Sequence, residues 1–334
     1  MIKVYFDWNV FAQIKNGKHI ELRTIVFNDK RLFIPYSMSH INDIFSSYNK
    51  NIGITDDIDS DLHYLSKITC NRYLFNNGVS IDLAYCQPNE LFQNKINTSF
   101  AGENCYADVG KIFSDLVDPI CSDILKGIKL DLGAAFENAE CAKLLDTVLP
   151  GLRDNQTFGG IVDGFCKYFN SCSNGEGYKN LRQILQSTIS INRDKIFNSD
   201  DPYQQIEAFY KKLNVDFSEY LKEVLNYKST PDWFSNIVIE YSILDMHGYQ
   251  EDRINIQKGR KETAKNMIDD ALHAAFASTC NFYVTNDKKA YKKTKMIYQK
   301  MQKDTMVLKP DEFVSYYNEF LKSEDMRPSG DYWS

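Results

Sequence analysis

The chain has 334 residues and a formal net charge of −6, with 43% apolar and 25% charged residues. This composition is typical of a folded globular protein and excludes wholesale disorder. No apolar run approaches the roughly 20 residues that a membrane-spanning helix needs. A chain of this length is expected to form two parts rather than a single core.

The N-terminus and the cysteines indicate a cytosolic protein. Asp7 stands where a signal peptide would need an apolar segment. None of the eight cysteines belongs to a Cys-x-x-Cys pair, so a zinc site has little support. We expect them to be reduced and mostly buried thiols.

The first 50 residues predict the opening of a parallel α/β sheet. Residues 2–6 read as a strand, and Asn9 is the predicted N-cap of the helix that follows. Residues 32–36 read as a second strand, and Ser39 is the predicted cap of a second helix with apolar residues at helical spacing. Strand, helix, strand, helix is how such a sheet begins.

The middle of the chain, from about 51 to 230, has a different character. Its apolar spacing predicts helices at 62–70, 109–128, 139–149, 181–191, 206–213 and 217–225. Residues 72–93 are expected to include a hairpin. We find no internal repeat and no catalytic set of residues here, and we interpret the region as an insertion.

The α/β pattern resumes near Trp233. Helices are predicted at 234–246, 265–279, 288–303 and 313–321, and strands at 282–285 and 305–308. The predicted fold class is therefore α/β, with a parallel β-sheet flanked by helices and interrupted by a mainly α-helical insertion. The predicted boundaries are 1–50 and 233–334 for the α/β domain and 51–232 for the insertion.

Four acids lie at the edges of the predicted sheet: Asp7, Asp43, Asp270 and Asp287. The carboxyl ends of parallel strands share one edge, where ligands bind, so we expect these acids to converge. Four close carboxylates repel one another unless a cation compensates, and hard oxygen ligands select Mg²⁺ or Mn²⁺. Such a site activates water and neutralises charge on a phosphodiester.

Four segments also resemble the PIN-domain nucleases: Tyr5–Asn9, Pro35–Asp43, Asp270–Ala275 and Val284–Asp287. The shared pattern is an Asp after the first strand, an acid on the second helix, an Asp opening a small-residue helix, and a Ser/Thr-x-Asp after the next strand. The resemblance covers roughly the first 50 and the last 100 residues, and the middle is unmatched. It implies a metal-dependent nuclease with a parallel sheet between helices, usually acting on RNA.

The chain departs from that pattern at two positions. Asp43 stands where the family usually has Glu, and His40, one helical turn earlier, is a candidate to share its role. Asp269 and Asp270 are adjacent, and the spacing to the following small residues favours Asp270 as the ligand. Asp269 is then an auxiliary residue.

Other polar residues near these acids are auxiliary candidates. Thr285 and Asn9, and more weakly Ser37, are expected to orient the ligands or their waters. His273 is a further candidate, although a histidine at such a position is more often a hydrogen-bonded structural residue. Asp287 also has an ordinary explanation, as the N-cap of the lysine-rich helix after it.

The charge is unevenly distributed. Residues 258–303 contain eleven lysines and arginines against four acids, a local balance of +7, which leaves −13 for the rest of a chain whose total is −6. A basic segment around acidic ligands suits a site that receives a phosphodiester backbone. Four lysines that follow Asp287 are expected to contact phosphates: Lys288, Lys289, Lys292 and Lys293.

The function predicted from these observations is an Mg²⁺- or Mn²⁺-dependent endoribonuclease that leaves 5′-phosphate and 3′-hydroxyl ends. Expected partners are nucleic acid, chiefly RNA, an inhibitory protein and a second copy of the chain. Two alternatives stay open: a nuclease of the same fold acting on single-stranded or branched DNA, and a non-catalytic binding module. A haloacid-dehalogenase-like phosphatase is disfavoured, because that chemistry needs a second acid where this chain has Asn9.

Overall fold

A computed structural model of the chain describes residues 1–49, 51–99, 192–211, 233–252 and 263–321, together with short stretches and single positions between 129 and 186. The chain forms two compact units. Unit 1 comprises residues 1–96, 233–243 and 267–334, and unit 2 comprises residues 97–232 and 244–266. Unit 1 thus includes residues 51–96, which the sequence pattern grouped with the insertion.

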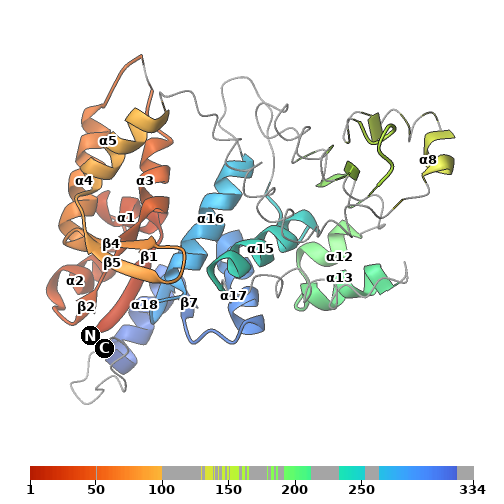
Figure 1. Ribbon diagram of the computed structural model, residues 1–334. Coiled ribbons are helices and arrows are strands. Elements are labelled where there is room, and N and C mark those ends of the chain that lie inside the picture. Colours follow the sequence, from red (N-terminus) through yellow and green to blue (C-terminus); the bar gives the residue numbers. More distant parts are fainter. Residues whose placement is uncertain are drawn as a thin grey trace. The chain divides into compact units, whose positions relative to one another are not determined.

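The centre of unit 1 is a four-stranded sheet in the order β2-β1-β6-β7, with every neighbouring pair parallel (Figure 1). Its strands are β1 (Ile2–Phe6), β2 (Leu32–Phe33), β6 (Phe282–Val284) and β7 (Met306–Leu308). The predicted α/β class with a parallel sheet flanked by helices is confirmed. In the register, Tyr5 pairs with Tyr283 and Phe6 with Val284, so two strands far apart in the sequence end side by side.

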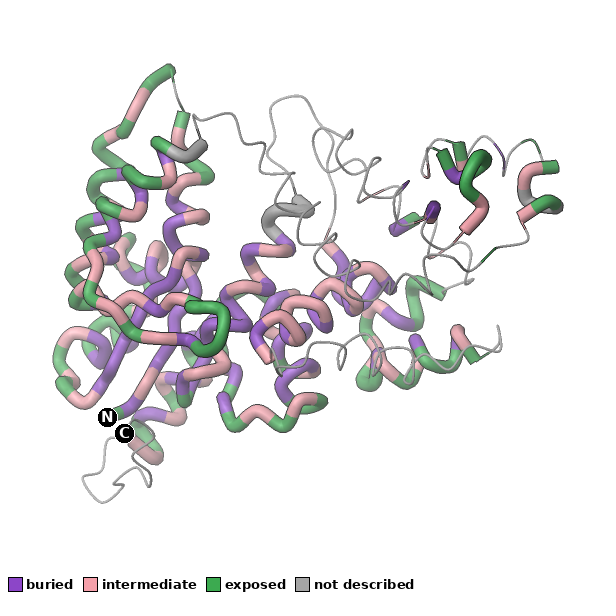
Figure 2. The backbone as a smooth tube through the Cα atoms, viewed as in Figure 1, coloured by how far each residue is buried: buried purple, intermediate pink, exposed green. Residues whose placement is uncertain are grey.

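Alternation along the strands builds a core on each face of the sheet. On one face, Val4 and Phe6 pack with residues of α1 (Trp8–Lys15), α2 (Ile20–Asn28) and α18 (Pro310–Tyr316). On the other, Tyr5 contacts α16 (Thr263–Ala277), whose alanines at 271, 274, 275 and 277 are fully buried. The hydroxyl of Tyr298, on α17 (Lys288–Lys300), donates to the backbone of α16. Strands β1, β2 and β6 are accordingly buried almost throughout (Figure 2), whereas Met306 of β7 is exposed.

The second predicted strand is split between two sheets. After β2 the chain passes Ile34 and Pro35 and then forms β3 (Tyr36–Ser37), which pairs with β4 (Arg72–Asn76) in a three-stranded sheet. Pro35 has no N–H to donate and interrupts the ladder. The predicted hairpin is confirmed, because β4 pairs antiparallel with β5 (Ile81–Tyr85).

The predicted helix caps at Asn9 and Ser39 are wrong by two residues. Asp7 is the N-cap of α1, and Ser37 is the N-cap of α3 (Met38–Phe45), which makes Asn9 and Ser39 residues of the first helical turn. Both helices begin directly where a strand ends. The side chain of Ser37 accepts from Ser39 N and completes a capping box with His40.

The remaining described elements are α4 (Asp56–Thr69), α5 (Pro88–Ser99), α8 (Gly133–Glu137), α12 (Arg193–Phe197), α13 (Pro202–Lys211), α15 (Trp233–Met246) and the π-helical turn η2 (Tyr317–Leu321). Of these, α4, α13, α15 and η2 overlap predicted helices, whereas α5, α8 and α12 correspond to no predicted helix. The predicted helices at 109–128 and 217–225, and most of those at 139–149 and 181–191, lie outside the described residues.

Unit 2 is held in part by a buried ionic network. Arg182 donates to Asp245 Oδ2 at 2.9 Å and to the carbonyl of Asp252 at 2.8 Å, and its side chain lies 3.5 Å from Glu251. Asp245 and Glu251 are almost wholly buried, so the arginine compensates charge that would be costly on its own. None of the described helices is long and apolar enough to cross a membrane.

Candidate metal centre

The strand order gives the sheet a switch point at β1. The chain moves from β1 outward to β2, and later returns to the opposite side of β1 to form β6 and β7. The crevice at the carboxyl ends of strands that diverge in this way is where open α/β sheets bind ligands. Asp7 directly follows β1 and Thr285 directly follows β6 at this edge.

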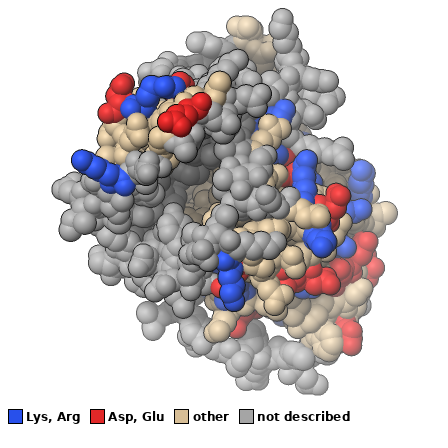
Figure 3. Space-filling view, turned by 90° about the vertical axis from the view of Figure 1, so that its right-hand side faces the viewer, with Lys and Arg blue, Asp and Glu red and all other residues tan. Residues whose placement is uncertain are grey.

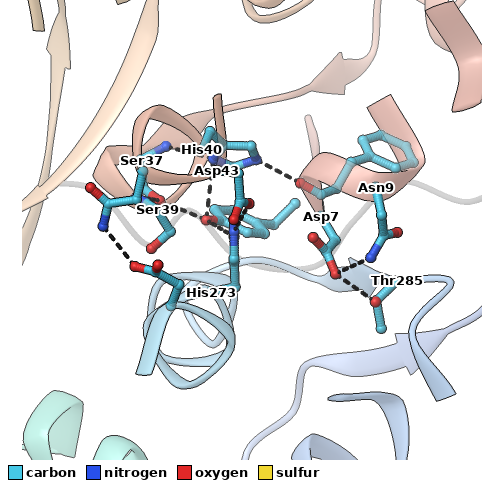
Figure 4. Close-up of polar contacts among 12 residues, drawn as sticks. Asp7, Asn9, Ser37, Ser39, His40, Asp43, His273 and Thr285 are labelled. Atoms are coloured by element: carbon cyan, nitrogen blue, oxygen red, sulfur yellow. Dashed lines mark hydrogen bonds and ion pairs between the residues drawn. The ribbon is translucent and has the colours of Figure 1, made fainter. Parts of the chain in front are cut away.

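Asp7 is buried and held on one oxygen. Its Oδ2 accepts hydrogen bonds from Thr285 Oγ1 at 2.7 Å and Asn9 Nδ2 at 2.8 Å, and lies 3.5 Å from the hydroxyl of Tyr283. Figure 4 shows Asn9 and Thr285 converging on this carboxylate. Its other oxygen, Oδ1, forms no hydrogen bond with any described residue. The carboxylate is therefore fixed in orientation with one oxygen left to bind a ligand.

Asp43 and His273 complete a cluster with Asp7. Asp43 extends from α3, and its Oδ2 lies 2.8 Å from Nε2 of His273 on α16 (Figure 4). One ligand atom from each of these three residues lies within 4.8 Å of the others, the only such group of His, Cys, Asp and Glu side chains among the described residues. These three side chains could hold a metal ion.

His273 is tied at its second nitrogen. The hydroxyl of Tyr5 lies 2.9 Å from His273 Nδ1 and 2.6 Å from Ser37 Oγ, and all three side chains are buried. Burial disfavours the protonated imidazole, but the bond to Asp43 and the negative charges nearby outweigh it and raise the pKa of His273. Burial also raises the pKa of Tyr5 well above its usual value, so the phenol keeps its proton.

His40 has a structural role. Its Nε2 lies 2.8 Å from the carbonyl oxygen of Phe6, to which it donates, and its Nδ1 accepts from the backbone N–H of Ser37 at 3.1 Å. Burial, followed by the neighbouring His273, holds the pKa of His40 well below its usual value. Both ring nitrogens of a neutral imidazole are thus used to dock α3 on the end of β1, and neither is directed at a ligand.

The adjacent acids of α16 differ in their surroundings. Asp269 is buried, and its Oδ1 accepts from Asn42 Nδ2 of α3 at 2.7 Å. Asp270 is partly exposed, and its charge together with that of Asp7 adds to the burial that raises the pKa of Tyr283. Asp270 therefore lies within electrostatic range of Tyr283 on β6 and does not belong to the cluster of three.

Asp287 is exposed and caps α17. Its Oδ1 accepts from the backbone N–H groups of Lys289 and Ala290 at 2.7 and 2.8 Å. Its own N–H donates to Thr285 Oγ1 at 3.1 Å, the hydroxyl that also binds Asp7. Capping therefore accounts for the hydrogen bonds to Oδ1 of Asp287. The backbone N–H of the same residue links it to Asp7 through Thr285.

The four lysines expected to contact phosphates separate by burial. Lys288 and Lys292 are exposed and Lys289 is partly exposed. Lys293 is fully buried, with its ammonium 4.7 Å from the ring centre of Tyr241 on α15, so its expected contact with a phosphate is wrong.

On the face of the molecule shown in Figure 3, the described basic and acidic side chains are interspersed.

The sequence pattern gives two members of the centre less weight than the structure does. His273 is an auxiliary candidate there and lies in the cluster, and Tyr5, which binds it, is not a candidate. The available signal is spacing, because Asp269, Asp270 and His273 fall at i, i+1 and i+4 of one helix and positions four apart share a face. Tyr5 is a buried residue of β1, and the sequence pattern does not distinguish it from an ordinary core residue.

Comparisons of the chain with protein-family models, with curated proteins and with solved structures find no match.

Proposed function

We propose that this chain is a divalent-metal-dependent endoribonuclease that hydrolyses phosphodiester bonds to 5′-phosphate and 3′-hydroxyl ends. The observation that carries the proposal is the convergence of Asp7, Asp43 and His273 at the switch point between β1 and β6. Its second support is the resemblance of four segments to PIN-domain nucleases. This resemblance matches the acidic positions of that family to Asp7, Asp43, Asp270 and Asp287.

The donor set fits a divalent cation. Two carboxylates and one imidazole bring charges and lone pairs within 4.8 Å, and the two carboxylates repel each other unless positive charge lies between them. A bound Mg²⁺ or Mn²⁺ would lower the pKa of a coordinated water and would neutralise the charge that develops on the phosphate.

The protein contributes position and charge. Thr285 and Asn9 orient the carboxylate of Asp7, while Tyr5 orients His273. The resemblance assigns Asp270 and Asp287 to the same centre, and Asp287 is linked to Asp7 through Thr285. Lys288 and Lys292 provide exposed positive charge beside Asp287 and contact the phosphates of the strand.

The test is cleavage of labelled RNA and DNA of one sequence in Mn²⁺ or Mg²⁺, with the ends mapped. We expect RNA to be cut to 5′-phosphate products, EDTA to abolish cutting, and Asp7→Asn or Asp43→Asn to lower the rate at least about 100-fold, because removing a ligand costs several kcal/mol of transition-state stabilisation.

Asp311→Asn is the matched control, since the Asp311 side chain is 93% exposed and lies on α18. Cutting that persists in EDTA, or that Asp7→Asn leaves undiminished, would overturn the proposal. Faster cutting of DNA would keep the chemistry and change the substrate. Absence of cutting together with absence of divalent-ion binding would favour a non-catalytic module.

A further inference from the structure

The candidate centre contains a nitrogen ligand in place of an all-carboxylate set. His273 lies on α16, four residues after Asp269, and its Nε2 points at Asp43 Oδ2 across a distance of 2.8 Å. Only 1% of the His273 side chain is exposed, so no solvent competes for this nitrogen. The metal selectivity of a site depends on the ligand type as well as the ligand number.

A chain of hydrogen bonds leaves Nε2 of His273 as the nitrogen that faces the cluster. The hydroxyl of Tyr5 is hydrogen-bonded to Nδ1 of His273 at 2.9 Å and to Ser37 Oγ at 2.6 Å. When Nε2 binds a cation, Nδ1–H donates to the Tyr5 oxygen and Tyr5 donates to Ser37, so every group in the chain has a partner. Second partners of this kind fix the tautomer and the ring orientation of metal-binding histidines.

The second histidine nearby cannot take this role. The rings of His40 and His273 lie 4.8 Å apart, but both nitrogens of His40 are engaged by the backbone at Phe6 and Ser37. Among the described residues, His273 is therefore the histidine that contributes a nitrogen to the cluster.

Imidazole nitrogen binds transition-metal dications better than Mg²⁺, which prefers carboxylate, carbonyl and water oxygens. Mn²⁺ takes carboxylate oxygens as Mg²⁺ does and, as a transition-metal dication, gains more than Mg²⁺ from an imidazole nitrogen. We propose that His273, held by Tyr5, makes this centre bind Mn²⁺ in preference to Mg²⁺. This inference rests on the proposed metal centre and narrows its cofactor.

The test measures affinity for the metal alone. Mn²⁺ binding is followed by electron paramagnetic resonance of free Mn²⁺, and Mg²⁺ binding by competition. Wild type is expected to bind Mn²⁺ at least about 10-fold more tightly than Mg²⁺. His273→Gln offers an amide oxygen near the position of Nε2, and we expect this preference to fall at least about 10-fold, mainly through loss of Mn²⁺ affinity.

Tyr5→Phe tests the positioning and removes only the hydroxyl. We expect Mn²⁺ affinity to fall by about 10–100-fold with a smaller effect on Mg²⁺. Tyr36→Phe is the matched control, because Tyr36 is equally buried and its hydroxyl donates to the carbonyl of Cys86 at 2.6 Å. General destabilisation lowers both affinities together, so the Mn²⁺/Mg²⁺ ratio separates positioning from folding.

The outcomes are distinct. An unchanged ratio in His273→Gln, or equal affinities of wild type for the two ions, would overturn this inference while leaving a metal centre in place. A wild-type protein that binds neither ion would overturn the proposed centre as well. A lower ratio in His273→Gln and Tyr5→Phe, with the wild-type ratio kept in Tyr36→Phe, would support it.

Discussion

At the scale of the residue, the candidate centre is defined by how each carboxylate is held. Oδ2 of Asp7 accepts from Thr285, which directly follows β6, and from Asn9, in the first turn of α1 after β1. A carboxylate fixed in this way keeps its second oxygen in one direction. Preorganised ligands lose less entropy on binding, so the support should matter for affinity as much as the ligand itself.

Thr285→Val tests this support without changing side-chain shape. The variant loses the 2.7 Å bond to Asp7 and the 3.1 Å bond from Asp287 N, and we expect divalent-ion affinity to fall by about 10–100-fold. Thr294→Val is the control, because Thr294 is also fully buried and its hydroxyl has no hydrogen-bond partner among the described residues. Calorimetric titration with Mn²⁺ measures both, and an equal loss in the two variants would contradict the assigned role.

At the scale of the element, α17 has two lysine faces with different roles. Lys293 packs over Tyr241, Lys300 binds Glu240 at 2.7 Å, and Lys303, just beyond the helix, packs over Trp233, so these lysines face α15. Lys288 and Lys292 are one helical turn apart and exposed. A basic segment therefore divides into lysines that hold the fold and lysines that remain at the surface.

Replacing Lys288 and Lys292 together by alanine should weaken RNA binding and its salt dependence. Each lost phosphate contact lowers the slope of log affinity against log salt by about 0.7 for a single strand, so the double variant should lose about 1.4. Fluorescence anisotropy at several salt concentrations measures the slope. Lys67→Ala, an exposed lysine in the last turn of α4, is the control, and a slope that falls equally there would argue against a role for α17.

The docking of the C-terminal helical segment predicts an acid-sensitive contact. Asp29, after α2, binds Arg31 and the hydroxyl of Tyr317 in η2, and the hydrogen bond from Arg31 is the main cause that lowers its pKa from 3.8 to about 2. A carboxyl with a depressed folded-state pKa stabilises the fold above its unfolded pKa and loses that contribution as pH falls through the folded value.

Asp29→Asn should therefore lower the free energy of unfolding by about 1 kcal/mol at neutral pH, because solvent screens the partly exposed pair with Arg31, and by much less near pH 2. Urea unfolding of wild type and variant between pH 6 and pH 2 measures the difference. A difference that stays constant across this range would show that the contact is not the source of the pH dependence.

At the scale of the whole molecule, unit 1 is assembled from three separate stretches of the chain. Asp7 and Asp43 come from the first stretch and His273 from the last, more than 220 residues later. The candidate centre thus exists only when these stretches fold together. A ligand of this centre should stabilise unit 1 as one body.

Tryptophan fluorescence can report on this unit. Trp8 and Trp233 belong to unit 1, and the residue ranges of unit 2 contain no tryptophan. Free Mn²⁺ at 100 times its dissociation constant should stabilise the fluorescence-detected transition by about 2.7 kcal/mol. Asp7→Asn should abolish this shift, and a shift that persists in the variant would place the ion elsewhere.

Much of the fold is readable from local pattern. The spacing of apolar residues predicts β1, the hairpin of β4 and β5, and most described helices, because burying one face imposes a period of 2 or 3.6 on the sequence. The helix starts at Asp7 and Ser37 are harder to predict, since Asn9 and Ser39 are equally good capping residues. The choice between such candidates depends on where the preceding strand ends.

Local pattern was enough to select Asp7, which directly follows β1, and to select Asp43 as an acid of α3. Which of these side chains meet depends on how distant parts of the chain pack. This packing brought His273 to Asp43, assigned both nitrogens of His40 to the backbone, and buried Lys293. These outcomes depend on contacts between α3, α16 and β1, which lie far apart in the chain and leave no local periodicity to read.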